Sequence, residues 1–107
     1  MTDFDDRKRG EEAKFAFDEE NAFKIAARRN RLLGHWAAEM MGLNAEETDA
    51  YAKSVVQADF EEAGDEDVIR KLLGDLTTAN VEIDESDVRT ALEEKLVEAR
   101  RQLMSES

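Results

Sequence analysis

Hydrophobic residues recur at helical spacing in four successive segments of the chain, which are separated by short polar stretches. The third segment has the most regular pattern, because its apolar positions follow one another at alternating intervals of one and three residues. These positions are Val68, Ile69, Leu72, Leu73 and Leu76. The spacing predicts a helix that begins after Asp65 and buries one narrow apolar stripe, with an exit through Thr77, Thr78 and Asn80.

The other three segments show the same period over different lengths. The first runs from about Asp18 to Met41, and its expected core face is Ala22, Phe23, Ala26, Ala27, Leu33, Trp36, Ala37, Met40 and Met41. In the second, the expected face is Tyr51, Ala52, Val55, Ala58 and Ala63. In the fourth, it is Val88, Ala91, Leu92, Leu96, Ala99 and Leu103.

The boundaries of these helices carry recognisable signals. Gly42 suits the left-handed residue that ends a helix, and Gly64 is expected to end the second one. Asn44 followed by Glu47 predicts a capping box at the start of the second helix. Asp65 and Asp84 are expected to cap the third and fourth helices. Negative charge favours a helix N-terminus and positive charge a C-terminus, as in Asp18, Glu19 and Glu20 at the first start and Arg100 and Arg101 in the last turn of the fourth helix.

Composition supports an all-α fold in one domain. The chain has 107 residues, no Pro and only 5 Gly, and 41% of its residues are hydrophobic. Helices joined by loops of a few residues usually pack as antiparallel neighbours. We therefore expect residues 19–107 to form a four-helix bundle.

Residues 1–18 do not continue this pattern. Acidic and basic residues alternate in blocks, the apolar residues form no sustained stripe, and Gly10 disfavours a helix by about 1 kcal/mol relative to Ala. We interpret the segment as a flexible N-terminal arm that becomes helical on a partner. A simple frayed terminus is the alternative.

The charge distribution restricts the class of partner. The net charge is −12, divided into −1 for residues 1–43 and −11 for residues 44–107. Binding to nucleic acid or to an anionic membrane needs concentrated positive charge, so neither is expected. No apolar run approaches the roughly 20 residues that span a bilayer, and the N-terminus lacks a signal peptide, which predicts a cytoplasmic protein without membrane insertion.

The residues needed for catalysis or for a cofactor are largely missing. Cys is absent and His35 is the one histidine, so nucleophilic catalysis is not expected. The acidic stretch from Asp59 to Asp67 lacks the ligand spacing and central Gly of a calcium loop. The glycines are too scattered for a phosphate-binding loop. We predict a protein that is not an enzyme and has no metal site.

One basic cluster suggests a ligand. Arg28, Arg29 and Arg31 precede Trp36, and an arginine beside an aromatic ring could hold an adenine nucleotide or RNA through charge and stacking. The competing interpretation, which we favour, is a solvated helix face with Trp36 in the core. Binding to another protein is the function class that remains.

Several blocks resemble the zeta-type inhibitor subunit of bacterial F-type ATP synthase. In the N-terminal segment they are Phe4-Asp5-Asp6-Arg7, Glu12-Ala13-Lys14-Phe15 and Asp18-Glu19-Glu20. In the first helix they are Ala27-Arg28-Arg29-Asn30, Leu32-Leu33-Gly34 and Trp36-Ala37-Ala38-Glu39. Further on they are Tyr51-Ala52-Lys53 and the eleven-residue block from Ala58 to Val68. The resemblance runs from Phe4 to about Leu76.

The resemblance implies a four-helix bundle whose residues 1–18 enter the catalytic head of the ATP synthase, among its alpha, beta and gamma subunits, and block ATP hydrolysis. The protein would then lie at the inner face of the membrane through this complex. The expected contact residues are Phe4, Asp5, Asp6, Arg7, Lys8, Arg9, Glu12, Lys14, Phe15 and Phe17. A nucleotide-binding regulator and a non-inhibitory structural subunit are the alternatives.

Two positions depart from the family's pattern. Phe17 stands where many relatives carry His, so sensing of pH by a histidine in the arm is not expected. Gly10 opposes a preformed inhibitory helix, which favours an arm that folds on contact.

Overall fold

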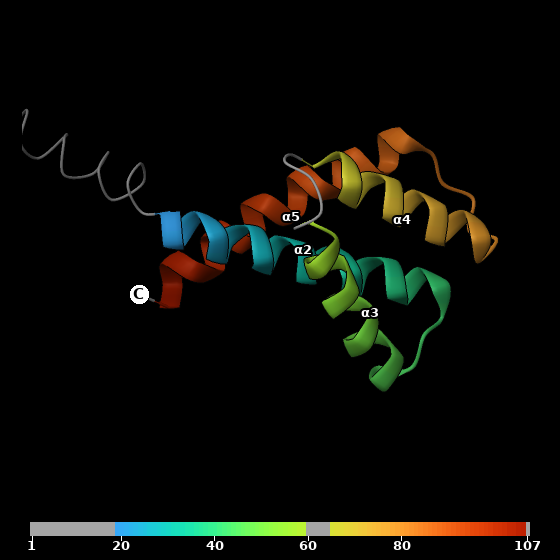
Figure 1. Ribbon diagram of the computed structural model, residues 1–107, viewed down its shortest axis with the longest axis horizontal. Helices are drawn as coiled ribbons and strands as arrows, with labels where there is room; N and C mark the ends of the chain where they lie inside the picture. Colours follow the sequence, from blue (N-terminus) through green and yellow to red (C-terminus); the bar gives the residue numbers. More distant parts are fainter. Residues whose placement is uncertain (1–18, 60–64, 107) are drawn as a thin grey trace, which may run out of the picture.

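The computed structural model describes residues 19–59 and 65–106. These residues form four helices, α2 (Glu19–Met41), α3 (Ala45–Ala58), α4 (Glu66–Thr78) and α5 (Glu85–Glu106), labelled as in Figure 1. No strand occurs within the described ranges. The prediction of an all-α, four-helix fold is confirmed, whereas the predicted arm, residues 1–18, lies outside the described residues.

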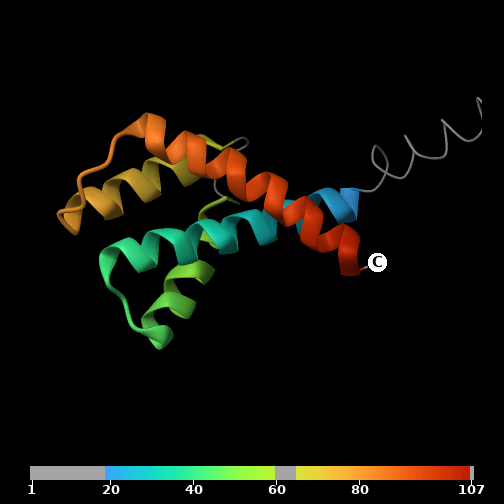
Figure 2. The same cartoon turned by 180° about the vertical axis from the view of Figure 1, so that it is seen from behind.

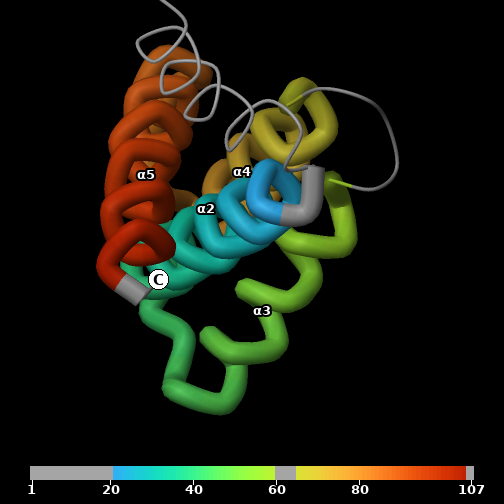
Figure 3. The backbone as a smooth tube through the Cα atoms, turned by 90° about the vertical axis from the view of Figure 1, so that its left-hand side faces the viewer, coloured from blue at the N-terminus to red at the C-terminus, as the bar shows by residue number. Residues whose placement is uncertain are grey.

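Successive helices run in opposite directions, so the start of α2 and the end of α5 lie at the same end of the bundle (Figures 1 and 2). Seen from that end, α2 lies between α5 and α3, with α4 beside it (Figure 3). The most extensive helix contacts are those of α2 with α3 and with α5. Within the described residues the backbones of α3 and α5 do not approach each other closely, and a strip of α2 lies between them (Figure 3).

The core is contributed by all four helices. The stripe predicted for α4 is confirmed, since Val68, Ile69, Leu72 and Leu76 are buried and Leu73 packs against them. The remaining buried members of the core cluster are Leu33, Ala37, Val55, Val88, Ala91 and Leu92. Burial of this apolar surface is the main stabilising contribution to the fold.

The first turns of α2 do not join the core as expected. Ala22 is exposed, and the side chain of Phe23 is 54% exposed. The reason is that α2 extends beyond α3 and α4, so that of the other described helices only the end of α5 lies beside its first turns (Figure 1). At the other end of α2 the prediction for Met40 is also wrong, because that residue is exposed.

Three of the predicted boundary signals are confirmed. Gly42 has a φ of 74°, the left-handed conformation that ends α2. Asn44 Oδ1 accepts a hydrogen bond from the Glu47 amide at 2.8 Å, and Glu47 Oε1 accepts one from the Asn44 amide at 2.9 Å. Asp84 forms the same reciprocal pair with Asp87 at the start of α5.

Three other boundary predictions are wrong. Helix α3 ends at Ala58 and Asp59 is in a turn, so the helix does not continue to Gly64, which itself lies outside the described residues. Asp65 occupies the N-cap position of α4, but its side chain makes no capping hydrogen bond. Arg100 and Arg101 precede the last turn of α5, because that helix continues to Glu106, and Arg101 pairs with Glu98 instead.

Gly34 allows α2 and α3 to come unusually close together. A Cβ placed on this buried glycine would lie 2.5 Å from Cα of Ala52 and 3.0 Å from its Cβ. Both distances are shorter than normal van der Waals contact, so any larger residue would push the two helices apart. Among the helical glycines, Gly74 is the opposite case, since a Cβ there would meet nothing within 4 Å.

Tyr51 links α3 to α4. Its hydroxyl donates a 2.7 Å hydrogen bond to Asp75 Oδ2, which also lies 3.0 Å from Lys71 Nζ. The same ammonium lies 5.1 Å from the centroid of the tyrosine ring, within the range of a cation–π contact. Burial, followed by the hydrogen bond to Asp75 and its negative charge, raises the pKa of Tyr51 above its ordinary value.

Replacing Gly34 by Ala should destabilise the bundle by about 1–3 kcal/mol, the usual cost of overpacking a tight interior. The matched change Gly74→Ala should stabilise it by about 0.5–1 kcal/mol, because alanine is the better helix former and the site is open. Urea denaturation followed by circular dichroism measures both. Equal effects of the two changes would mean that the α2–α3 approach is not a tight contact.

The hydroxyl of Tyr51 should ionise only well above about pH 10, the value of an unperturbed tyrosine. Since the folded-state pKa is raised, the hydrogen bond stabilises the fold fully below about pH 10 and this contribution is lost as the pH rises further. Tyr51 is the one tyrosine in the chain, so tyrosinate absorbance reports on it alone. Tyr51→Phe should remove that component of the alkaline destabilisation. An ordinary midpoint in the folded protein would contradict this assignment.

Candidate functional site

The residues predicted to contact the ATPase lie outside the described residues. They are Phe4, Asp5, Asp6, Arg7, Lys8, Arg9, Glu12, Lys14, Phe15 and Phe17. The described chain begins just after them, with the exposed first turns of α2, and these turns and the surface around them are where a functional site can be examined.

The four residues considered for nucleotide binding do not converge on one opening. Arg29 is 5% exposed, and Trp36 is partly buried against the hydrophobic core. Arg28 is partly buried and Arg31 is exposed, and both line a surface groove that neither Arg29 nor Trp36 reaches. Arg28 and Arg31 therefore lie on a different side of α2 from Arg29 and Trp36.

Arg29 neutralises the two carboxylates that flank the connection between α3 and α4. Its Nη1 lies 3.0 Å from Asp65 Oδ1 and its Nη2 lies 3.8 Å from Asp59 Oδ2. Its Nε donates a 2.9 Å hydrogen bond to Asn30 Oδ1. A buried charge is tolerated only when it is paired in this way, so the guanidinium serves the fold.

This pairing also accounts for part of the acidic stretch from Asp59 to Asp67. Two of its members form ion pairs with Arg29, so these carboxylates have a structural role in the described part of the chain. Within the described ranges, no group of three or more metal-binding side chains is arranged to hold an ion. None of the described helices is both long and apolar enough to cross a membrane.

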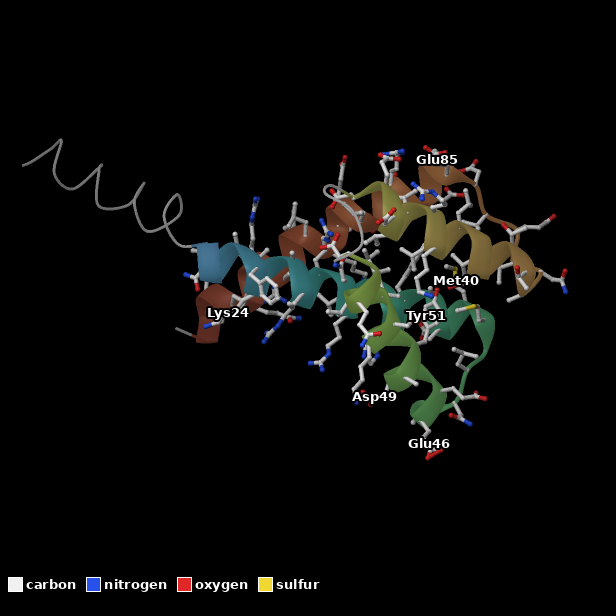
Figure 4. The ribbon with its side chains drawn as sticks, viewed as in Figure 1. Lys24, Met40, Glu46, Asp49, Tyr51 and Glu85 are labelled. Atoms are coloured by element: carbon white, nitrogen blue, oxygen red, sulfur yellow. The ribbon has the colours of Figure 1, made fainter. Side chains whose placement is uncertain are left out.

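The groove beside Arg31, which we call the basic groove, follows the strip of α2 between α3 and the end of α5. It is lined by Phe23, Lys24, Ala27, Arg28 and Arg31 of α2, Lys53, Val56 and Gln57 of α3, and Leu103 of α5. Arg28 Nη1 donates a 3.3 Å hydrogen bond to Gln102 Oε1, which ties α2 to α5 at this point. Figure 4 shows Lys24 near the outer end of α2, close to the last turns of α5.

The lining of the basic groove is positively charged although the chain as a whole is strongly acidic. Of the nine described residues that line it, four are Lys or Arg and none is Asp or Glu. Lys53 lies 3.4 Å from Asp49, but both side chains are more than half exposed, so the pair is weak. Arg31 forms no ion pair with any described carboxylate. The groove is therefore suited to an anionic group that carries an apolar portion.

Sequence reasoning found Arg28 and Arg31 but missed Lys24 and Lys53. Lys24, Arg28 and Arg31 stand at positions i, i+4 and i+7, so the helical period alone could have placed Lys24 on the same face. Lys53 joins them only through the packing of α3 on α2. No local pattern in the sequence predicts that contact.

Arg29→Lys should lower the free energy of unfolding by about 1–3 kcal/mol, because one ammonium cannot at the same time bond Asn30 through an Nε–H group and pair with Asp65 at 3.0 Å and Asp59 at 3.8 Å. Arg101→Lys is the control, since Arg101 is 65% exposed and its pair with Glu98 is worth at most about 1 kcal/mol. Urea denaturation followed by Trp36 fluorescence measures both variants. Equal losses would show that the contacts of Arg29 contribute no more than a surface pair.

Two comparisons with known proteins gave matches, and one of them identifies a family. A solved structure described as a solution NMR structure of a protein shares 50% sequence identity and aligns with a TM-score of 0.71, covering 79% of this chain and 96% of the other. A search of curated proteins gave no match. The model of a family described as ATPase inhibitor subunit zeta matches residues 1–102, which is nearly the whole chain and includes both the N-terminal segment and the bundle. The chain therefore belongs to the ATPase inhibitor subunit zeta family.

Proposed function

We propose that this chain inhibits ATP hydrolysis by an F-type ATP synthase, by inserting residues 1–18 into the catalytic interface formed by the alpha, beta and gamma subunits of the head. The observation that carries the proposal is the family match over residues 1–102, because it includes the N-terminal segment together with the bundle. An inhibitor subunit acts through binding and needs no chemistry of its own.

The bundle supports this proposal by the way it presents its N-terminal end. Helix α2 extends beyond α3 and α4, and Phe23 in its second turn is 54% exposed. A segment attached at this end would enter a cleft in a partner while the wider bundle stayed outside. The start of α2 would then lie at the rim of the contact.

The composition of residues 1–18 fits such an insertion. Phe4, Phe15 and Phe17 would fill apolar pockets, and large aromatic anchors contribute much of the energy of protein interfaces. Arg7, Lys8, Arg9 and Lys14 would pair with acidic groups of the head, which favours fast association and a defined register. Asp5, Asp6 and Glu12 supply hydrogen-bond acceptors beside them.

The nucleotide-binding alternative receives less support from the geometry. Trp36 packs on the core and Arg29 is held by two aspartates, so neither is presented to a ligand with Arg28 and Arg31. Trp36 is the one tryptophan of the chain, which makes its fluorescence a direct probe. Titration with ATP should leave that fluorescence unchanged, and a saturable change would favour this alternative.

Deleting residues 2–18 should abolish inhibition of ATP hydrolysis by the cognate head, because it removes the inserted segment. The helical signal in circular dichroism should remain, since the four described helices contribute a buried core cluster of their own. Hydrolysis is measured over a range of inhibitor concentrations, together with a pull-down on the head. Undiminished inhibition by the truncated chain would disprove the assignment. A full-length chain that binds without slowing hydrolysis would identify a structural subunit.

A matched pair of variants separates the arm from the bundle. Phe15→Ala with Phe17→Ala should weaken inhibition by about tenfold or more, because each truncated anchor costs about 1 kcal/mol or more. The control, Val97→Ala with Met104→Ala, truncates the side chains of two residues of α5 that are 64% and 67% exposed. It should leave inhibition unchanged. The reverse result would place the contact on α5.

A further inference from the structure

We propose that the acidic tip of this chain, Asp3-Phe4-Asp5-Asp6, docks in the basic groove of the same molecule. This contact would hold the N-terminal segment against its own bundle, in what we call the stowed state. The contact itself stands without the proposed function. Its regulatory consequence, a segment that must leave the groove before it can enter the ATPase head, rests on that function. Three properties of the two parts support the contact: their charge, their position and their reach.

The basic groove offers charge and apolar surface together. The four cations among its described lining residues come from two helices, and none of these described residues is a carboxylate. Arg31 has no described ion-pair partner, and Lys53 has only the exposed Asp49 at 3.4 Å. Phe23, Val56 and Leu103 supply the apolar part, with more than half of the Phe23 side chain exposed.

The tip has the complementary composition. Residues 3–6 contain three aspartates and one phenylalanine and no cation, whereas Arg7, Lys8 and Arg9 come directly after them. The carboxylates would face Arg31 and Lys53, and the ring of Phe4 would lie against the apolar lining. The basic block after the tip would be repelled by the same groove, which limits the docked part to the tip.

The position of the groove allows this contact within one chain. It begins at Phe23 and Lys24, in the first turns of the helix to which the segment is attached. From Glu19 to Arg31 is about 18 Å along α2, at about 1.5 Å per residue. Residues 7–18, about a dozen, can span up to roughly 40 Å when extended. The tip can therefore reach any part of the groove.

The weakness of the contact indicates that the groove binds the chain's own N-terminal segment and not a separate acidic molecule. Exposed ion pairs are individually weak. A few such pairs and one aromatic contact would hold a separate acidic peptide with a dissociation constant of about 1 mM or weaker, because association also costs translational and rotational freedom. A separate acidic peptide would not bind at ordinary concentrations, but a short tether supplies an effective concentration of about that size. The stowed and released states would then be close in free energy, so a stronger partner could extract the segment.

The experiment uses a spin label on the full-length chain. The chain contains no cysteine, so Thr2→Cys provides a unique attachment site for a nitroxide beside the tip. The measured quantity is the broadening of backbone amide signals in the 15N-labelled protein. We expect strong broadening at Arg31, Lys53 and Val56. Raising the salt from about 0.1 M to about 1 M shortens the Debye length from about 10 Å to about 3 Å and should reduce the broadening.

Charge variants test whether the broadening comes from the proposed contact. Asp5→Lys with Asp6→Lys, or Arg31→Glu with Lys53→Glu, should each remove it, and the combination of all four changes should restore it. The control is Arg89→Glu, which reverses an exposed charge that pairs with Glu66 and Glu85 near the start of α5. This control should leave the broadening unchanged.

Three results would overturn the proposal. One is broadening that only declines with distance from Glu19 and is insensitive to the charge changes, since a tether alone produces that pattern. Another is broadening of an unlabelled 15N chain by a spin-labelled chain mixed with it, which would put the tip in a second copy. The third is loss of ATPase inhibition in Arg31→Glu with Lys53→Glu when the wild-type groove signals show no broadening, which would make the groove a contact for the head. The spin-label measurement contains no ATPase, so a failure of the proposed function would leave its result unaffected.

Discussion

The close approach of α2 and α3 at Gly34 and Ala52 sets the geometry of much of the bundle. A side chain at position 34 would meet the backbone of Ala52, so the separation of the two helices depends on its absence. That separation lets Leu33 and Val55 share the core with α4 and α5. It also brings Lys53 and Val56 beside Arg31, which creates the basic groove. The contact between Gly34 and Ala52 thus affects both the packing of the core and the position of the residues that line the basic groove.

The parts of the fold that could be predicted are those that depend on neighbours in sequence. The apolar stripe of α4 and the capping boxes at Asn44 and Asp84 are local patterns, and the structure reproduces them. The exposure of Phe23 could not be predicted, because it depends on where α3 and α4 end relative to α2. The role of Arg29 is equally non-local, since its partners, Asp59 and Asp65, are about thirty positions away and meet it only in the folded bundle.

The fold and the proposed function draw on different parts of this chain. The described helices contain the core cluster, while the family match includes the N-terminal segment as well. The charge follows the same division. Helix α2 carries four Lys or Arg against three Glu, and three of these four cations line the basic groove, whereas most of the negative charge lies in the second half of the chain. A bundle with this polarity presents its cationic groove on the side where the segment is attached.

The ion pairs of Arg29 have a consequence for how this family can vary. Asp59 and Asp65, the residues on either side of positions 60–64, are both held by the same guanidinium. The ends of that connection stay together whatever chain lies between them, and doubling the length of a loop closed in this way costs only about 0.6 kcal/mol of chain entropy. Insertions between α3 and α4 should therefore accumulate during evolution more readily than insertions elsewhere, and the same place would accept an engineered tag or a grafted peptide.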